Sequence, residues 1–264
     1  IMGVRPTEYF VYDGAINHNS RIDQILKWLD YAPSKRPQFI STYFSLMDDV
    51  GHGYGPDSDE VKSGIEEMDK TIGRLINGLK SRNMFDDVNI MLVSDHGMAS
   101  TSSDSMIFLD DYINMDNVTM VDGTPVTAIL PKIHVDSIYS KLKNAHPKMR
   151  VYKKGAAPER LHYNNHRRIQ PITAVADEHW SISTRVYFNK DNNDDRYEGA
   201  THGFDPIYKS MGGIFVGYGP AFKSGLKGPG VTNIHLYEMM CNILELVPAK
   251  NDGHLDSTAV FLSN

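Results

Sequence analysis

Two apolar runs in this chain each end in a short packet that holds aspartate and histidine, and this pattern constrains the fold most. Residues 38–47 (QFISTYFSLM) are rich in β-branched and aromatic side chains and lead directly into DDVGH. Residues 88–93 (VNIMLV) lead in the same way into SDHGM. Between them, residues 58–82 carry apolar side chains at helical spacing. Strand, polar loop, helix, strand and polar loop in this order are typical of an open α/β sheet whose site lies at the carboxyl ends of its strands.

The rest of the chain continues the alternation less regularly. We expect helices over residues 20–32, 135–144 and 233–246, and strands over residues 126–130, 172–176 and 212–217. No repeat, low-complexity tract or convincing linker divides the sequence, so residues 1–264 are expected to belong to one domain. Because the chain opens abruptly at IMGVRPTEYF, we expect a processed or partial product.

Composition excludes several functional classes. With 264 residues and 41% hydrophobic residues, the chain is long enough to bury a sizeable core. Its net charge of −6, without a long basic run, predicts no nucleic-acid-binding surface. A bound phosphate would therefore be held by metal ions or by dipoles. The single cysteine, Cys241, excludes an internal disulfide and is expected to be a buried thiol. The sequence contains no signal peptide and no apolar run long enough to span a membrane.

Five side chains of the metal-ligand type occur in three packets, each next to a glycine. They are Asp48 and His52 in DDVGH, Asp95 and His96 in SDHGM, and His202 in THGFD. We expect the first pair to lie on a loop that folds back after its strand, and the second pair to lie on a turn that Gly97 permits. Carboxylate combined with imidazole favours zinc over magnesium or calcium. A single packet is also explained by a hydrogen-bonded turn, so the prediction depends on all three occurring together.

These segments resemble a known family in their order and spacing. The segments YFSLMDDVGHGYGP, MDKTIGRLINGLKSRN, NIMLVSDHGM, THGFD, FVGYGPAFK and NIHLYEMMCNIL are similar to those of the nucleotide pyrophosphatase/phosphodiesterase family of the alkaline phosphatase superfamily. The resemblance covers nearly the whole chain. It implies an α/β catalytic domain with a central mixed, mostly parallel sheet and helices on both faces, of which residues 1–264 lack the N-terminal part.

The resemblance also implies a site with two Zn²⁺ ions. Asp48, His52 and His202 match the ligands of one ion, and Asp95 and His96 match two ligands of the other. The family's threonine nucleophile and the remaining aspartate ligand belong to segments that would precede Ile1, either in the same polypeptide or in a separate chain. The resemblance therefore implies hydrolysis of nucleotide phosphodiester or pyrophosphate bonds to nucleoside 5′-monophosphate, with the isolated chain inactive.

The substrate is less well defined by the sequence. Tyr43 precedes Asp48 by five residues, where nucleotide-hydrolysing members of the family place a tyrosine against the base, and a role in the strand core explains it equally well. One alternative is hydrolysis of choline phosphodiesters, as in other relatives. Another is an inert fragment with a structural or binding role, because catalysis needs residues that this chain lacks.

Several other motifs have plainer explanations. His162, His166, His179, His235 and His254 are expected to be solvated, packed or hydrogen-bonded. The acidic run of Asp191, Asp194 and Asp195 lacks the spacing of a calcium loop and predicts a solvated loop. The sequence Asn117-Val118-Thr119 fits the N-glycosylation acceptor pattern. It agrees with the extracellular habit, secreted or membrane-anchored, that the resemblance implies.

Overall fold

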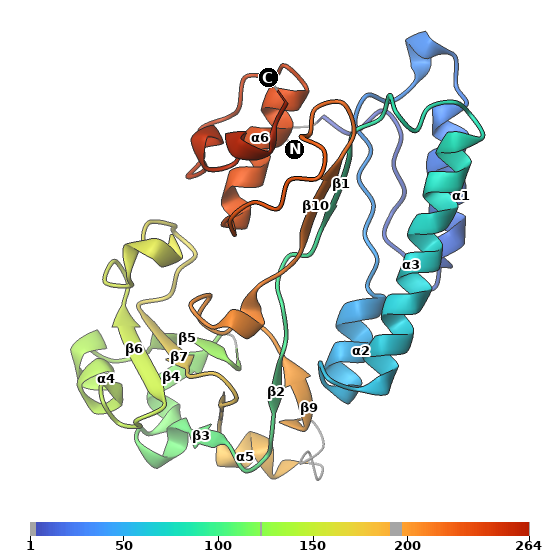
Figure 1. The fold of residues 1–264 in the computed structure, drawn as a ribbon. Helices are drawn as coiled ribbons and strands as arrows, with labels where there is room; N and C mark the ends of the chain where they lie inside the picture. The colour runs from blue at the N-terminus through green and yellow to red at the C-terminus, as the bar shows by residue number, and fades with distance from the viewer. Residues whose placement is uncertain (1–3, 122, 191–196, 264) are drawn as a thin grey trace.

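The computed structural model describes residues 4–121, 123–190 and 197–263. Figure 1 shows the helices of the first third on one side, a two-stranded ribbon in the middle, and a four-stranded sheet with its own helix on the other side. The helices are α1 (His18–Leu29), α2 (Leu46–Tyr54), α3 (Asp59–Lys80), α4 (Val135–Leu142), α5 (Arg185–Phe188) and α6 (Leu236–Ile243). No helix among the described residues combines the length and the apolar character that a membrane span requires.

The two long helices form where the sequence predicts them, and they pack against each other. Ser58 caps α3 by accepting a hydrogen bond from the backbone of Val61. The cap of α1 is Asn17, so the helix begins two residues before residue 20, where the sequence predicts its start. Apolar side chains of α1 and α3 form one buried cluster: Ile22, Ile25, Leu26, Leu29 and Leu79. Their helical spacing creates the shared face.

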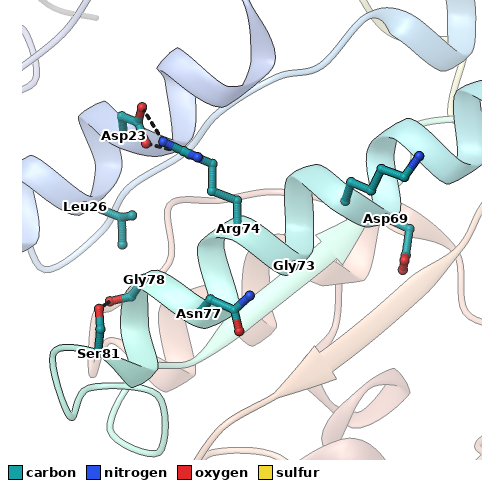
Figure 2. Close-up of a pocket in the computed structure, with 9 residues that line it drawn as sticks. Asp23, Leu26, Asp69, Gly73, Arg74, Asn77, Gly78 and Ser81 are labelled. Atoms are coloured by element: carbon teal, nitrogen blue, oxygen red, sulfur yellow. Dashed lines mark hydrogen bonds and ion pairs between the residues drawn. The ribbon is translucent and has the colours of Figure 1, made fainter.

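An ion pair joins helices α1 and α3 on their polar side. Arg74 of α3 donates from Nε and Nη2 to the two carboxylate oxygens of Asp23 of α1, at 2.7 and 2.9 Å. Figure 2 shows this pair beside a groove between the helices, with Leu26 directed toward Gly78. A methyl group on Gly78 would lie 2.3 Å from Cδ1 of Leu26, so the Leu26 side chain would have to move to admit one.

The strands form four small sheets. Three of them are pairs: β1 (Ile90–Val93) with β10 (Phe215–Tyr218), β2 (Ala99–Thr101) with β9 (Gly199–Thr201), and β3 (Met106–Phe108) with β8 (Ser181–Ser183). The fourth has the order β4 (Val118–Met120), β5 (Val126–Pro131), β7 (Ile172–Ala176) and β6 (Met149–Lys153). Within the described ranges only β3 and β8 run parallel. The mixed α/β class is confirmed, but a single, mostly parallel sheet is not what these residues form.

The expected strand over residues 38–47 is wrong in this structure. Residues 39–45 form neither a helix nor a strand, and the chain then enters α2. In the part of the chain that the structure describes, no backbone hydrogen bond joins residues 38–44 to a neighbouring strand. A β-strand exists only when its amides and carbonyls pair across a ladder. The β-branched and aromatic residues of this run therefore form no strand among the described residues.

The other expected elements form with small shifts of their ends. The helices expected over residues 135–144 and 233–246 correspond to α4 and α6, and the strands expected over residues 126–130, 172–176 and 212–217 correspond to β5, β7 and β10. Cys241 is buried, as predicted. The largest core cluster lies around the four-stranded sheet and includes Ile129, Ile172, Phe204 and Met211. The acidic run of Asp191, Asp194 and Asp195 lies outside the described residues.

Candidate metal centre

Asp48 and His52 lie on helix α2, not on the loop that the sequence predicts. Their spacing of four residues places both side chains on one face of a helix. The Nε2 atom of His52 is 3.5 Å from Oδ1 of Asp48. The glycines in DDVGHGYG favoured a loop, yet the helix continues to Tyr54. The two side chains still converge as expected, although helical geometry brings them together.

The second packet, with Asp95 and His96, follows the end of β1. Its backbone lies close to another backbone segment. The amides of Gly97 and Met98 donate to the carbonyls of Met211 and Ser210, both at 3.0 Å. A Cβ atom at Gly97 would lie 1.9 Å from the carbonyl oxygen of Ser210. Glycine is therefore required here by a close backbone approach and not by the sharp turn that the sequence suggests. This contact fixes the chain immediately after His96.

The third packet follows strand β9, which also positions the first. His202 comes directly after Thr201, the last residue of β9. The backbone carbonyl of Ala200 lies 2.9 Å from Nδ1 of His52. When Nδ1 carries the proton, it donates to this carbonyl and leaves Nε2 free as a ligand atom. No side-chain pattern identifies Ala200 in the sequence, because only its backbone oxygen takes part.

The three packets converge on one carboxylate oxygen. Oδ1 of Asp48 lies 3.5 Å from Nε2 of His52, 3.9 Å from Nε2 of His96 and 3.6 Å from Nε2 of His202. The ring of His96 stacks on that of His202 with centroids 3.5 Å apart. Oδ2 of Asp95 lies 3.5 Å from Nε2 of His96. The structure therefore brings together all five side chains that the sequence singles out.

The electrostatics of this cluster fit a bound cation. Asp48, His52 and His202 offer ligand atoms within 4.8 Å of one another. Oδ1 of Asp48 is buried and has no hydrogen-bond partner among the residues that the structure describes. Burying a carboxylate oxygen without a compensating donor or cation is costly, and a metal ion provides that compensation. Burial, followed by the neighbouring His96, lowers the pKa of His202, which favours the neutral imidazole that binds metal.

Tyr43 lies near this cluster and is partly exposed. Its pKa is raised by burial first and then by the negative charges of Asp48 and Asp95. The ring of Tyr12 lies 6.0 Å from that of Tyr43, at an angle of 58°. Both tyrosines line a cavity bounded by residues 6–12, α1 and residues 37–43. Sequence analysis did not identify Tyr12, because nothing in the pattern links residues 12 and 43.

The remaining histidines make other contacts. Nδ1 of His179 lies 2.7 Å from the carbonyl oxygen of Ser100, and Nδ1 of His235 accepts from the amide of His254 at 3.0 Å. His162 lies 3.5 Å from the carboxylate of Asp252. His166 accepts from the amide of Arg168 at 3.2 Å. These contacts agree with the packed or hydrogen-bonded roles expected for them.

Comparisons with known proteins identify the family to which the chain belongs. The sequence model of the type I phosphodiesterase / nucleotide pyrophosphatase family matches residues 2–205. Bis(5′-adenosyl)-triphosphatase enpp4 of Xenopus laevis is 37% identical over 265 residues, which cover 100% of this chain and 57% of that protein. Human ectonucleotide pyrophosphatase/phosphodiesterase family member 5 is 37% identical over 250 residues, which cover 94% of this chain and 50% of that protein. The chain thus spans about half the length of these curated relatives.

A solved structure agrees in fold as well as in sequence. Murine ectonucleotide pyrophosphatase/phosphodiesterase 5, as an inactive threonine-to-alanine variant in complex with AMP, superposes with a TM-score of 0.88 at 36% identity. The match covers 100% of this chain and 68% of that one. The family match, the identity over nearly the whole chain and the shared fold agree with the resemblance found in the motifs. The chain belongs to the type I phosphodiesterase / nucleotide pyrophosphatase family.

Proposed function

We propose that the protein to which this chain belongs hydrolyses phosphodiester or pyrophosphate bonds of nucleotides and releases nucleoside 5′-monophosphate. The observation that carries this proposal is the convergence of His52, His96 and His202 on Oδ1 of Asp48. Such a mixture of carboxylate and imidazole suits a metal centre that acts on phosphoryl groups. The AMP complex of the murine relative supports a nucleotide as the substrate class.

The metal centre in this proposal holds two Zn²⁺ ions. Asp48, His52 and His202 would bind one ion, and Asp95 and His96 would provide two ligands of the other. Zinc bound there would supply Lewis acidity that withdraws charge from a phosphoryl oxygen and favours deprotonation of an attacking hydroxyl group. The chain's own residues orient these ligands. The carbonyl of Ala200 holds Nδ1 of His52, and the carbonyl of Gly97, 2.8 Å from Nδ1 of His96, holds that ring.

The nucleophile in this proposal is a threonine from sequence that adjoins this chain in the whole protein. Support comes from the murine relative, which is inactive when a threonine is replaced by alanine. Residues 39–44 make no backbone hydrogen bond to a strand among the described residues, so their amides and carbonyls are open to pairing with adjoining sequence. The missing ligand of the second zinc is assigned to the same adjoining sequence.

An extracellular location, secreted or membrane-anchored, is part of the proposal. The human and murine relatives are named as ectonucleotide enzymes. The acceptor pattern at Asn117 also agrees with passage through the secretory pathway. Asn117 uses its backbone amide and carbonyl in hydrogen bonds to Asn114 and Lys132. The residue is partly exposed.

Hydrolysis assays on the whole protein test the proposal. We expect the zinc-loaded protein to convert diadenosine triphosphate or ATP to AMP, and a strong chelator to abolish this activity until zinc is restored. Glycerophosphocholine is the control substrate, because turnover of that compound alone would assign the protein to the choline phosphodiester alternative. A zinc-loaded whole protein that hydrolyses neither class would support the inert alternative instead.

A substitution at Tyr43 tests where the nucleotide binds. If the base stacks on this ring, Tyr43→Ala raises KM for the nucleotide by about tenfold with a smaller change in kcat, because stacking is worth roughly 1–3 kcal/mol per base. Tyr43→Phe keeps the aromatic face and is expected to leave KM within about twofold. The control is Tyr54→Ala, which removes a tyrosine that is 61% exposed at the end of α2. Equal KM values for Tyr43→Ala and the unmodified protein would assign Tyr43 to packing.

A further inference from the structure

An ion pair with one buried partner holds the segment that begins at His202. Arg160, from the connection between β6 and β7, donates from Nη1 and Nη2 to the two carboxylate oxygens of Asp205, each at 2.6 Å. The side chain of Asp205 is only 4% exposed, whereas that of Arg160 is 44% exposed. The guanidinium group is the first cause that lowers the pKa of Asp205, so the carboxylate stays charged inside the protein. The pair joins two regions that are 45 residues apart in the sequence.

Asp205 lies in the middle of residues 202–211, which we call the His202 segment. The segment starts at the ligand His202. It ends at the carbonyls of Ser210 and Met211, which accept hydrogen bonds from Met98 and Gly97, directly after His96. One stretch of backbone thus carries His202 of the third packet and contacts the second packet. A shift of the His202 segment would therefore move both His202 and the residues that follow His96.

Asp205 also fixes the local shape of this segment. Its Oδ1 accepts the amide of Ile207 at 3.0 Å, and its carbonyl accepts the amide of Tyr208 at 3.0 Å. A carboxylate that is buried and loses its cation must take up a proton or move toward water. Either response disturbs these turns, which lie three residues beyond His202. The side chains of Phe204 and Met211 are buried in the main core and also hold the segment by packing. The effect of the ion pair on His202 therefore has to be separated experimentally from its effect on general stability.

We propose that Arg160 is a positioning residue for the metal centre: through its two hydrogen bonds to Asp205 it sets the position of the His202 segment, and thereby of His202 and of the chain after His96. The inference rests on the proposed function in taking His202 as a zinc ligand. Arg160 itself touches none of the five ligand side chains in the structure. Its effect is indirect and is expected in zinc affinity and kcat more than in KM.

The test uses three variants of the whole protein: Arg160→Met, Arg160→Lys and Asp205→Asn. The methionine removes the charge and keeps an apolar stem, while the lysine keeps the charge and loses the two-pronged geometry. Zinc affinity is measured by competition with a chromophoric chelator, together with kcat, KM and the thermal midpoint. We expect Arg160→Met to lower zinc affinity about tenfold, the usual scale for residues that orient metal ligands, and Arg160→Lys to lower it less.

Arg74→Met is the matched control. Arg74 forms the same two-bond pair with Asp23 on the α1–α3 face (Figure 2), and neither residue contacts a proposed ligand. We expect this variant to retain zinc affinity and kcat within about twofold. Asp205→Asn provides the second control, because adding Arg160→Met to it should cause little further loss if Arg160 acts through Asp205.

The outcomes separate positioning from stability. A folded Arg160→Met protein with a lower thermal midpoint but unchanged zinc affinity and kcat would overturn the inference. If the methionine variant does not fold, Arg160→Lys decides, because that variant must weaken zinc binding more than Arg74→Met does. The measurement of zinc affinity requires no substrate. A wild-type protein that hydrolyses no nucleotide would therefore refute the proposed function and leave this inference to be judged by metal binding.

Discussion

Replacing Asp48 by asparagine is expected to abolish zinc binding at the cluster of Asp48, His52 and His202, and to lower hydrolysis by on the order of a hundredfold or more. Oδ1 of Asp48 lies 3.5 to 3.9 Å from the Nε2 atoms of all three histidines. The amide of asparagine has nearly the same shape but no negative charge, and one of its two ends is a donor. The substitution therefore removes the charge and a ligand atom while leaving α2 intact. Zinc content of the purified protein, measured with its activity, checks this result.

The neighbouring residue provides a matched control. Asp49 is exposed on the same helix and has the same side chain. Asp49→Asn makes the same chemical change one residue away, outside the cluster, and should retain zinc and activity within about twofold. If Asp48→Asn also kept its full zinc content, Asp48 would not be a ligand and the proposed centre would have to be rebuilt around other residues.

The second large effect is expected from Gly97→Ala. The added methyl carbon would lie 1.9 Å from the carbonyl oxygen of Ser210 and 2.8 Å from that of Gly212. Backbone atoms cannot rotate away as a side chain does, so the two segments must separate and the bonds from Gly97 and Met98 weaken. We expect a loss of at least about 2 kcal/mol of unfolding free energy, seen as a thermal midpoint lower by ~4 °C or more. Zinc affinity should fall as well, because His96 precedes this contact.

Gly73→Ala distinguishes this clash from a general intolerance to alanine. Gly73 lies inside α3, and an added methyl group meets no atom within 4 Å. Alanine is favoured over glycine in a helix interior by roughly 0.5–1 kcal/mol, so this variant is expected to be slightly more stable. Equal thermal midpoints for Gly97→Ala and the unmodified protein would mean that the backbones at Gly97 and Ser210 are not held as closely as the structure places them.

Local patterns in the sequence were sufficient for the long helices α1 and α3, but not for α2 and α5. Apolar residues at helical spacing predicted α3 almost to its ends. These signals act within a few residues, so no knowledge of the rest of the fold is needed. The strand predicted before Asp48 was wrong for the opposite reason, since a strand depends on a partner that can lie anywhere in the chain. Sheet order and direction were therefore the weakest part of the prediction.

The candidate site shows the same division. Residue chemistry and the family motifs identified Asp48, His52, Asp95, His96 and His202 in the sequence. The sequence also favoured zinc, because the pairing of carboxylate with imidazole is a property of residue types. Glycines inside the first packet suggested a loop, whereas the structure uses one face of α2. The choice between loop and helix did not affect the ligands, since both bring residues 48 and 52 together.

By itself, the sequence identified the proposed ligand residues, the two long helices and the family, because these depend on residue identity and on patterns that are local or shared with relatives. Only the tertiary structure decided what holds the ligands in place. The carbonyl of Ala200 behind His52, the backbone contact at Gly97 and the Arg160–Asp205 pair all join segments that are far apart in the chain. Two of these three contacts use backbone atoms, which every residue carries, and so they leave no mark in the sequence.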